Sequence, residues 1–192
     1  SGASFPVGST TETYTVTDAA GNIASCSFTV TVNDTENPTI ACPSDITVDN
    51  LAGLCNAVAT FTAPTGMDNC PGATTVQTAG QASGTLFPTG TTVQTFTVTD
   101  ASGNTASCSF NVIVSDNEDP VIACPSDISV SNDAGQCDAV VNYSVPVGTD
   151  NCTGATTAQT AGLGSGATFP IGTTTETYTV TDAAGNTTSC SF

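Results

Sequence analysis

The feature that most constrains this chain is an internal repeat with a period of 82 residues. Nearly the same twenty residues occur at 9–28, 91–110 and 173–192, and the cysteines that have counterparts follow the same shift without insertion or deletion. Self-similarity at a fixed period is typical of arrays in which each repeat is one structural unit. The sequence therefore predicts a tandem array rather than one large globular domain.

The period places one complete repeat at 35–116. Residues 1–34 correspond to the C-terminal part of a repeat, and residues 117–192 form a repeat that lacks the end of its last strand. A lone hairpin is marginally stable in water. Two explanations are open: the chain is a segment of a longer array, which the overlapping phases of its ends favour, or a neighbouring chain completes it.

The repeated stretch has the pattern of two adjacent β-strands. Phe96 and Val98 alternate with threonines, 100–104 is a turn cluster of Asp, Ala, Ser, Gly and Asn, and apolar residues alternate again over 108–114. Period-two alternation around such a turn predicts strands with one buried face. No window shows a helical period, and short strands punctuated by Gly and Pro predict an all-β sandwich.

The charge balance narrows the classes of partner. The chain has 17 acidic residues and no Lys, Arg or His, so its formal net charge is −17. Nucleic acid is excluded as a direct partner because phosphate contacts need cationic side chains, and no stretch is apolar enough to insert in a membrane. Wherever the acids converge, a metal ion is the natural counter-charge.

The same composition argues against catalysis. Without His or Lys the chain has no Ser-His-Asp triad, phosphate-loop lysine or Schiff base. A two-carboxylate hydrolase built on Asp68 or Asp100 stays open, but it needs a cleft that an 82-residue sandwich scarcely provides. We expect no enzyme.

Each repeat carries four cysteines, with no C-x-x-C pair and no histidine beside them. This pattern favours disulfides over a zinc site. Disulfides persist in oxidising compartments, so the sequence predicts an extracellular, secreted or cell-surface protein.

Five motifs in fixed order resemble the hyalin repeat (HYR) family over the whole chain. In the complete repeat they are Cys42-Pro43-Ser44-Asp45-Ile46, Asp68-Asn69-Cys70, Ser83 to Thr92, Thr99 to Asn104, and Cys108-Ser109-Phe110. The resemblance implies tandem immunoglobulin-like sandwiches associated with adhesion. It also implies disulfides from Cys42 to Cys108 and from Cys124 to Cys190, and it leaves the partner of Cys26 before Ser1.

The remaining cysteines are assigned by elimination. Within each repeat two are left over, which predicts bonds from Cys55 to Cys70 and from Cys137 to Cys152. Disulfides of this kind would supplement the small core of an 82-residue domain.

The acids suggest structural calcium between repeats. Carboxylates at i and i+2 of an extended linker point the same way, and the acids of strand-joining turns could meet them. The candidate ligands are Asp34, Glu36 and Asn37 with Asp116, Glu118 and Asp119 in the linkers, Asp18, Asp100, Asn104 and Asp182 in the turns, and Asp68 and Asp150 in the Asp-Asn-Cys loops. Each motif also fits an ordinary Asx turn or loop cap, and this alternative stays open.

These observations predict a mechanical function: a stalk, filament or adhesin shaft built from copies of the repeat, stiffened by disulfides and calcium. The alternative is an adhesion module that binds a cell-surface carbohydrate or protein through loops such as 66–72.

Overall fold

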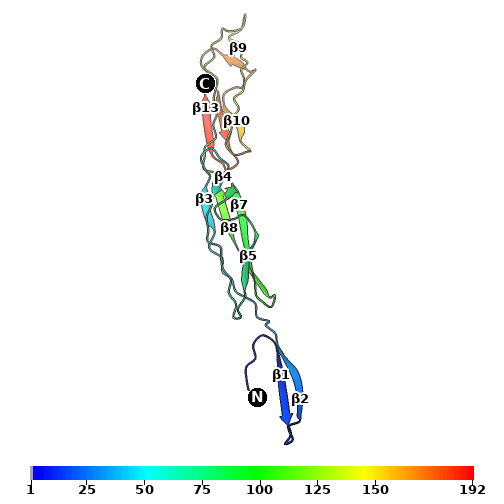
Figure 1. Cartoon of the computed structure of the whole chain (residues 1–192). Helices are drawn as coiled ribbons and strands as arrows, with labels where there is room; N and C mark the ends of the chain where they lie inside the picture. Colours follow the sequence, from blue (N-terminus) through cyan, green and yellow to red (C-terminus); the bar gives the residue numbers. More distant parts are fainter. Residues whose placement is uncertain (1) are drawn as a thin grey trace. The chain divides into compact units, whose positions relative to one another are not determined.

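The computed structural model of the chain describes residues 2–192, and every regular element in this range is a β-strand (Figure 1). Within these residues no helix has the length and apolar character needed to cross a bilayer. The predicted all-β class is confirmed.

The described residues form two compact units. The first holds the residues up to Ser44 with Thr62–Gly80 and Gln94–Phe110; the second holds Asp45–Phe61, Gln81–Val93 and Asn111–Phe192. The 34–38 linker with the loops around it lies entirely in the first unit, and the 116–120 linker lies entirely in the second. Each linker can therefore be described inside one unit.

The N-terminal part of the first unit is a hairpin of β1 (Gly8–Thr17) and β2 (Ile23–Val32), paired antiparallel from Gly8 with Val32 to Thr17 with Ile23. Tyr14 stacks on Phe28 with their ring centroids 6.1 Å apart, yet both side chains are more than half exposed. The hairpin thus has the apolar face of a sandwich sheet without a second sheet over it among the described residues.

The complete repeat contains two sheets. The larger has the order β3 (Ile46–Asp49), β8 (Thr105–Ser115), β7 (Gly90–Thr99) and β5 (Thr74–Ala79). The short β3 runs parallel to β8, and β5 is antiparallel to β7 with an irregularity near its end. The smaller sheet pairs β4 (Asn56–Val58) with β6 (Leu86–Pro88). Two sheets in one repeat confirm the sandwich that the period-two pattern predicts.

Alternate residues of β7 and β8 form the core, as the sequence predicts. Phe96 and Val98 on β7, and Phe110, Val112 and Val114 on β8, are at most 3% exposed. Their neighbours in the strands are half-buried or exposed, and apart from Ile113 they are threonines, serines and asparagines. Burial of one such side chain contributes about 1.5–3 kcal/mol.

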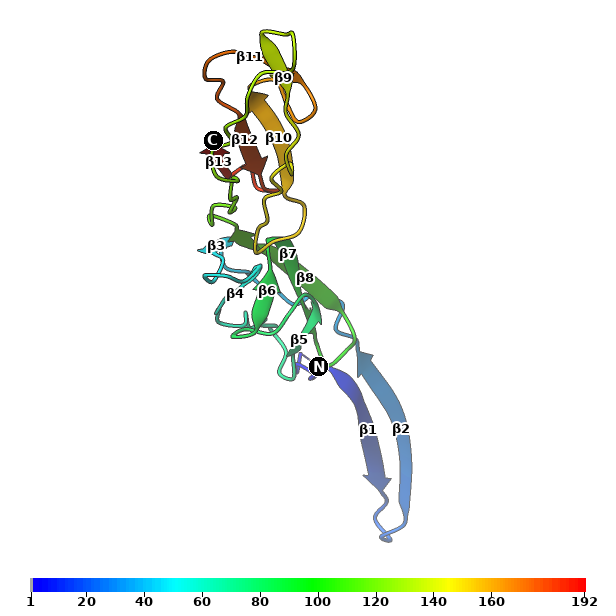
Figure 2. The ribbon, with the colours of Figure 1, turned by 90° about the horizontal axis from the view of Figure 1, so that it is seen from above.

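The third repeat has the same plan. Its larger sheet has the order β10 (Thr156–Ala161), β12 (Thr177–Thr181) and β13 (Thr187–Ser191), and its smaller sheet pairs β9 (Asp138–Val140) with β11 (Thr168–Pro170). Figure 2 shows β9 and β11 at one end of this repeat and the loop that precedes β10 at the other.

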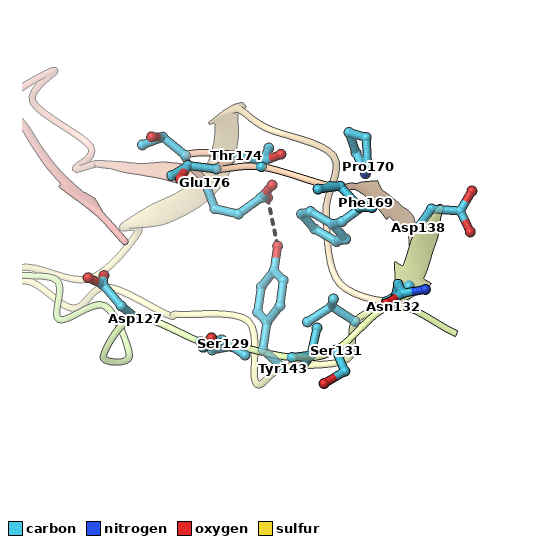
Figure 3. A pocket seen from close by; sticks show the side chains of 18 of the residues that line it. Asp127, Ser129, Ser131, Asn132, Asp138, Tyr143, Phe169, Pro170, Thr174 and Glu176 are labelled. Atoms are coloured by element: carbon cyan, nitrogen blue, oxygen red, sulfur yellow. Dashed lines mark hydrogen bonds between the residues drawn. The ribbon is translucent and has the colours of Figure 1, made fainter. Parts of the chain in front are cut away.

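One strand of this plan is not formed in the third repeat. Residues 128–131 are the counterparts of β3 but belong to no strand, and Ile128 and Val130 are 44% and 57% exposed. They line an open groove of about 690 Å³ together with Tyr143, Phe169 and other residues (Figure 3). The groove lies where the end of β8 pairs with β3 in the complete repeat.

Two disulfides follow the pairing that the family resemblance implies. Cys42 is bonded to Cys108 and Cys124 to Cys190, each with a Cα–Cα distance of 5.6 Å and a sequence separation of 66. Each bond links the segment before the first strand of its repeat to the last strand. Both predicted bonds are confirmed.

The pairing by elimination was wrong. Cys55 is bonded to Cys152 of the following repeat across 97 residues, with a Cα–Cα distance of 4.9 Å. The thiols of Cys26, Cys70 and Cys137 are free. The third repeat shows the physical reason. Cys137 directly precedes β9 and Cys152 belongs to the loop before β10, and β9 and this loop lie at opposite ends of one sandwich (Figure 2). A disulfide needs Cα atoms within about 7 Å of each other.

Candidate functional site: the acidic joints between repeats

Acidic residues gather at both linkers. We define the first joint as linker 34–38, loop 68–70 and turn 100–104, all in the first unit. The second joint is the counterpart in the second unit: linker 116–120, loop 150–152 and turn 182–186. The shift of 82 residues relates the two joints position by position.

Each joint brings one linker acid against one loop acid. Potential ligand atoms of Asp34, Asp68 and Cys70 lie within 4.8 Å of one another in the first joint. Asp116, Asp150 and Cys152 form the same group in the second. Two carboxylates this close repel each other unless a cation or a proton lies between them, and the chain has no cationic side chain.

The loop acid of each pair has a buried oxygen without a partner. The backbone N–H of Cys70 donates to Asp68 Oδ2 and that of Cys152 donates to Asp150 Oδ2, both at 2.8 Å. The other oxygens, Asp68 Oδ1 and Asp150 Oδ1, are buried and accept no hydrogen bond. Such an atom costs about 1–3 kcal/mol of stability unless a ligand satisfies it.

The chemistry of the donors fits calcium rather than a thiophilic metal. Cys152 is in a disulfide and offers no thiolate. A hydrogen bond to Asp34, burial and the charges of Asp34, Asp68 and Asp100 raise the pKa of the Cys70 thiol. Carboxylate oxygens are therefore the donors that both joints share, and hard oxygen ligands suit Ca²⁺.

The turn aspartates serve their own turns. Asp100 Oδ1 accepts the backbone N–H groups of Ser102 (2.9 Å) and Asn104 (2.8 Å), and Oδ2 accepts Asn104 Nδ2 (2.8 Å). Burial acts to raise the pKa of Asp100, but these hydrogen bonds outweigh it and lower the pKa. The Asx-turn alternative thus describes how this carboxylate is used.

Two counterparts of Asp100 behave in the same way. Asp182 accepts the backbone N–H groups of Gly185 and Asn186 and the Asn186 amide, and its pKa is lowered by these bonds against the effect of burial. In the hairpin, hydrogen bonds from the side chain and backbone of Asn22 lower the pKa of Asp18.

The turns reach the linkers through their asparagines. Asn104 Nδ2 also donates to the backbone oxygen of Asp34 (3.3 Å). Asn186 Nδ2 donates to the backbone oxygens of Asp116 (3.1 Å) and Glu118 (3.3 Å). The turns therefore position the linker acids by hydrogen bonding to their main chain.

The remaining linker residues point to other partners or to solvent. Glu36 Oε2 accepts Asn69 Nδ2 at 2.9 Å, whereas Glu118 Oε2 accepts the backbone N–H of Gly53 at 2.7 Å. Asn37 and Asp119 are exposed. The structure brings Asp34 together with Asp68, and Asp116 with Asp150, but it does not add these residues to either group.

A contact between repeats that the sequence analysis missed lies in the second joint. The loop Leu51–Cys55 of the complete repeat meets the third repeat through three groups: Gly53 N–H bonds Glu118, Asn151 Nδ2 donates to the Leu54 oxygen at 3.1 Å, and Cys55 is bonded to Cys152. The cysteine spacing fits both pairings, because Cys152 is the counterpart of Cys70 one period further along the chain.

Sequence comparison identifies the family. The sequence profile described as "HYR domain" matches residues 1–32, 33–114 and 115–192. "Hyalin" of Strongylocentrotus purpuratus is 38% identical over 187 residues, and "Hyalin" of Lytechinus variegatus is 39% identical over 189. Each match covers 95% of this chain, which spans 15% and 35% of those two proteins.

More distant matches include a rat protein described as "Sushi, von Willebrand factor type A, EGF and pentraxin domain-containing protein 1". It is 36% identical over 166 residues, which is 84% of this chain and 4% of that protein.

Solved structures with a similar backbone include human CDH23 EC21-23, with a TM-score of 0.38, 15% identity and coverage of 92% of this chain and 70% of that one. The protocadherin gammaB7 EC3-6 cis-dimer has a TM-score of 0.36 and 16% identity, and covers 95% of this chain and 58% of that one.

Family profile, relatives and disulfide-bonded sandwiches agree: this chain belongs to the HYR domain family and is an extracellular tandem-repeat protein.

Proposed function

We propose that the chain is a structural part of an extracellular array, a shaft or filament, in which Ca²⁺ holds the joints between HYR repeats. The observation that carries this proposal is the buried, unpartnered Oδ1 of Asp68 and of Asp150, each next to a second carboxylate in a chain without cationic side chains.

Asp34 with Asp68, and Asp116 with Asp150, would hold one ion per joint. Bound calcium would neutralise the charge of the paired carboxylates and would coordinate the oxygen atoms that accept no hydrogen bond. Linker and loop would then be fixed to one another, which stiffens the joint. The function that we propose is mechanical, with further HYR repeats as partners and with no catalytic step.

Calcium titration of the chelator-treated chain tests this proposal. We expect two ions per chain, and thermal unfolding shifted upward by calcium. A free concentration of 100 times the dissociation constant corresponds to about 2.7 kcal/mol per site. Asp68→Asn and Asp150→Asn should each abolish one of the two sites, because each removes the charge of one loop acid.

Asp127→Asn is the matched control, because Asp127 is exposed in the third repeat and belongs to neither acid group. It should leave both ions bound. The proposal is wrong if calcium at several millimolar neither binds nor stabilises the chain, or if the two loop variants bind as the parent does.

A further inference from the structure

The structure holds a disulfide between repeats, from Cys55 to Cys152. We propose that it recurs at every joint between adjoining HYR repeats of one polypeptide, and that Cys70 and Cys137 are its two unpaired half-sites. Cys70 takes the cysteine of a repeat that precedes it, and Cys137 takes the cysteine of a repeat that follows.

The two half-sites are the counterparts of the bonded residues. A shift of 82 maps Cys70 onto Cys152 and Cys55 onto Cys137. In the second joint Cys55 is bonded to Cys152. Their counterparts, Cys137 and Cys70, are free thiols. A partner at the observed separation of 97 residues would lie outside 1–192 for both free cysteines.

The loop that carries Cys137 has the conformation of the loop that carries Cys55. Leu54 N–H bonds the Leu51 oxygen, and Gln136 N–H bonds the Asp133 oxygen. An asparagine amide holds the carbonyl before each cysteine: Asn50 Nδ2 donates to Leu54 O at 3.1 Å, and Asn132 Nδ2 to Gln136 O at 2.7 Å.

The loop meets its partner repeat through backbone groups and the thiol. Gly53 gives its N–H and Leu54 its carbonyl oxygen, so the change from Leu54 to Gln136 leaves the bonding groups intact. Gly135 has a φ of +77°, close to the +71° of Gly53, and Cys137 is exposed. The loop that presents Cys137 is therefore already formed, and the Cys137 thiol is accessible.

The first joint has the receiving residues in an unengaged arrangement. Glu36, Asn69 and Cys70 are the counterparts of Glu118, Asn151 and Cys152, which hold the Gly53–Cys55 loop. In the first joint, Asn69 instead donates to Glu36 at 2.9 Å. In the first joint the asparagine amide and the glutamate carboxylate therefore bond each other. In the second joint, where the loop of the preceding repeat is in contact, both groups bond the backbone of that loop.

The bond forms by thiol–disulfide exchange with a small-molecule disulfide of the oxidised-glutathione class. One cysteine thiolate attacks that disulfide, forms a mixed disulfide and releases one small thiol. The second cysteine attacks the mixed disulfide, and the second small thiol leaves. Two protein thiols are oxidised, and one small disulfide is reduced to two thiols.

The test is a chain in which residues 35–116 are present twice in tandem, refolded in oxidised and reduced glutathione. The inserted repeat adds four cysteines and one joint. We expect its two half-sites to bond to one neighbour each, so the count of free thiols stays at three, as in the parent chain. Disulfide mapping by mass spectrometry should find the bond at the added joint and at the second joint.

Other results overturn the proposal. Five free thiols would mean that the added joint does not bond, and a single free thiol would mean pairing within each repeat. Disulfide-linked oligomers would place the partner in a second copy instead. Formation of the Cys42–Cys108 type of bond in every complete repeat is the internal check of folding.

A second variant keeps the test independent of the insertion. In the parent chain, Cys152→Ser should leave Cys55 free and raise the thiol count to four, whereas re-pairing of Cys55 with Cys70 would contradict the proposal. Cys26→Ser is the control, and it should lower the count by one. Both measurements should be unchanged by chelator, which separates this inference from the calcium proposal.

Discussion

Glu176 is a buried carboxylate that hydrogen bonds keep ionised without a cation. It is 2% exposed and accepts the backbone N–H groups of Leu163 (2.7 Å) and Gly164 (2.9 Å) and the Tyr143 hydroxyl (2.8 Å; Figure 3). Burial acts to raise its pKa, but these donors outweigh burial and lower the pKa below the usual 4.5. The same environment raises the pKa of Tyr143, through burial and its bonds to Tyr178 and Glu176.

Comparison of the repeats shows which neighbouring groups accompany a buried carboxylate at this position. In the complete repeat the counterparts are Gln94 and Phe61, so neither the acid nor the tyrosine hydroxyl is present there. In the hairpin the counterpart is Glu12, which is half-buried. A buried charge is tolerated where enough donors surround it.

The acid sensitivity of the third repeat should depend on Glu176. Because the folded pKa is lowered, the ionised group stabilises the fold above about pH 4.5, and this contribution is lost as the pH falls through the folded pKa. Glu176→Gln should therefore lose less stability on acidification than the parent chain does. Tyrosine fluorescence during urea unfolding measures this change, because the chain has no tryptophan.

Glu12→Gln is the control for that experiment. It removes an acid from the same strand position outside a sandwich, so the pH dependence of the third repeat should stay that of the parent. A parent-like acid profile in Glu176→Gln would contradict the role assigned to these donors.

The sequence predicts only in part which acidic side chains at the joints remain available to bind a cation. The Asp-x-x-Gly-Asn pattern fits both a calcium ligand and an Asx turn at Asp100, and in the structure this carboxylate bonds its own turn. That Asp68 keeps an unpartnered oxygen depends on burial by the surrounding loops, which no local pattern encodes.

At the scale of elements, strand formation depends on the partner as well as on local sequence. Residues 45–48 and 127–130 are nearly identical, yet β3 forms only in the complete repeat. Its parallel partner there is the end of β8, Val112–Ser115. The counterparts of those four residues would follow Phe192, so the groove beside Ile128 stays open.

An extension by the residues Asn-Val-Ile-Val-Ser-Asp, copied from 111–116, should fill that groove. The added valines would pair beside 128–131 in the register of Ile46 with Val112, and burial of the facing apolar side chains should stabilise the third repeat by about 3 kcal/mol. Hydrogen exchange at 128–131 should slow accordingly.

The control extension replaces both valines by aspartate and should leave exchange unchanged. Equal protection with both extensions would show that apolar burial does not drive the pairing.

The elements could be predicted where the pattern is local. Alternation around 100–104 predicted β7 and β8, and the family motifs predicted two disulfides correctly. The bond from Cys55 to Cys152 could not be derived by pairing cysteines within one repeat, because it is a contact between repeats.

At the scale of the whole molecule, covalent connection differs between the two joints. The second joint is spanned by its linker and by the bond from Cys55 to Cys152, whereas the first joint has its linker alone among the described residues. This difference can be measured by cutting the main chain in each linker, after Glu36 and after Glu118.

Complete digestion of the unfolded, unreduced chain by a glutamate-specific protease should release residues 13–36 at once. Residues 37–118, 119–176 and 177–192 should stay together and separate only after reduction, because the bonds Cys55–Cys152 and Cys124–Cys190 are then their sole connections. Mass spectrometry before and after reductant detects both outcomes. Separation of the two larger fragments without reductant would contradict the observed pairing.

Any tension applied across the second joint would be shared between two covalent routes, the Asp116–Pro120 backbone and a sulfur bridge anchored in the Leu51–Cys55 loop. A thiol in the surroundings would open the bridge and leave the polypeptide continuous, so the whole load would then fall on five linker residues. The redox state of the medium would thus determine how far such a joint extends under a given force.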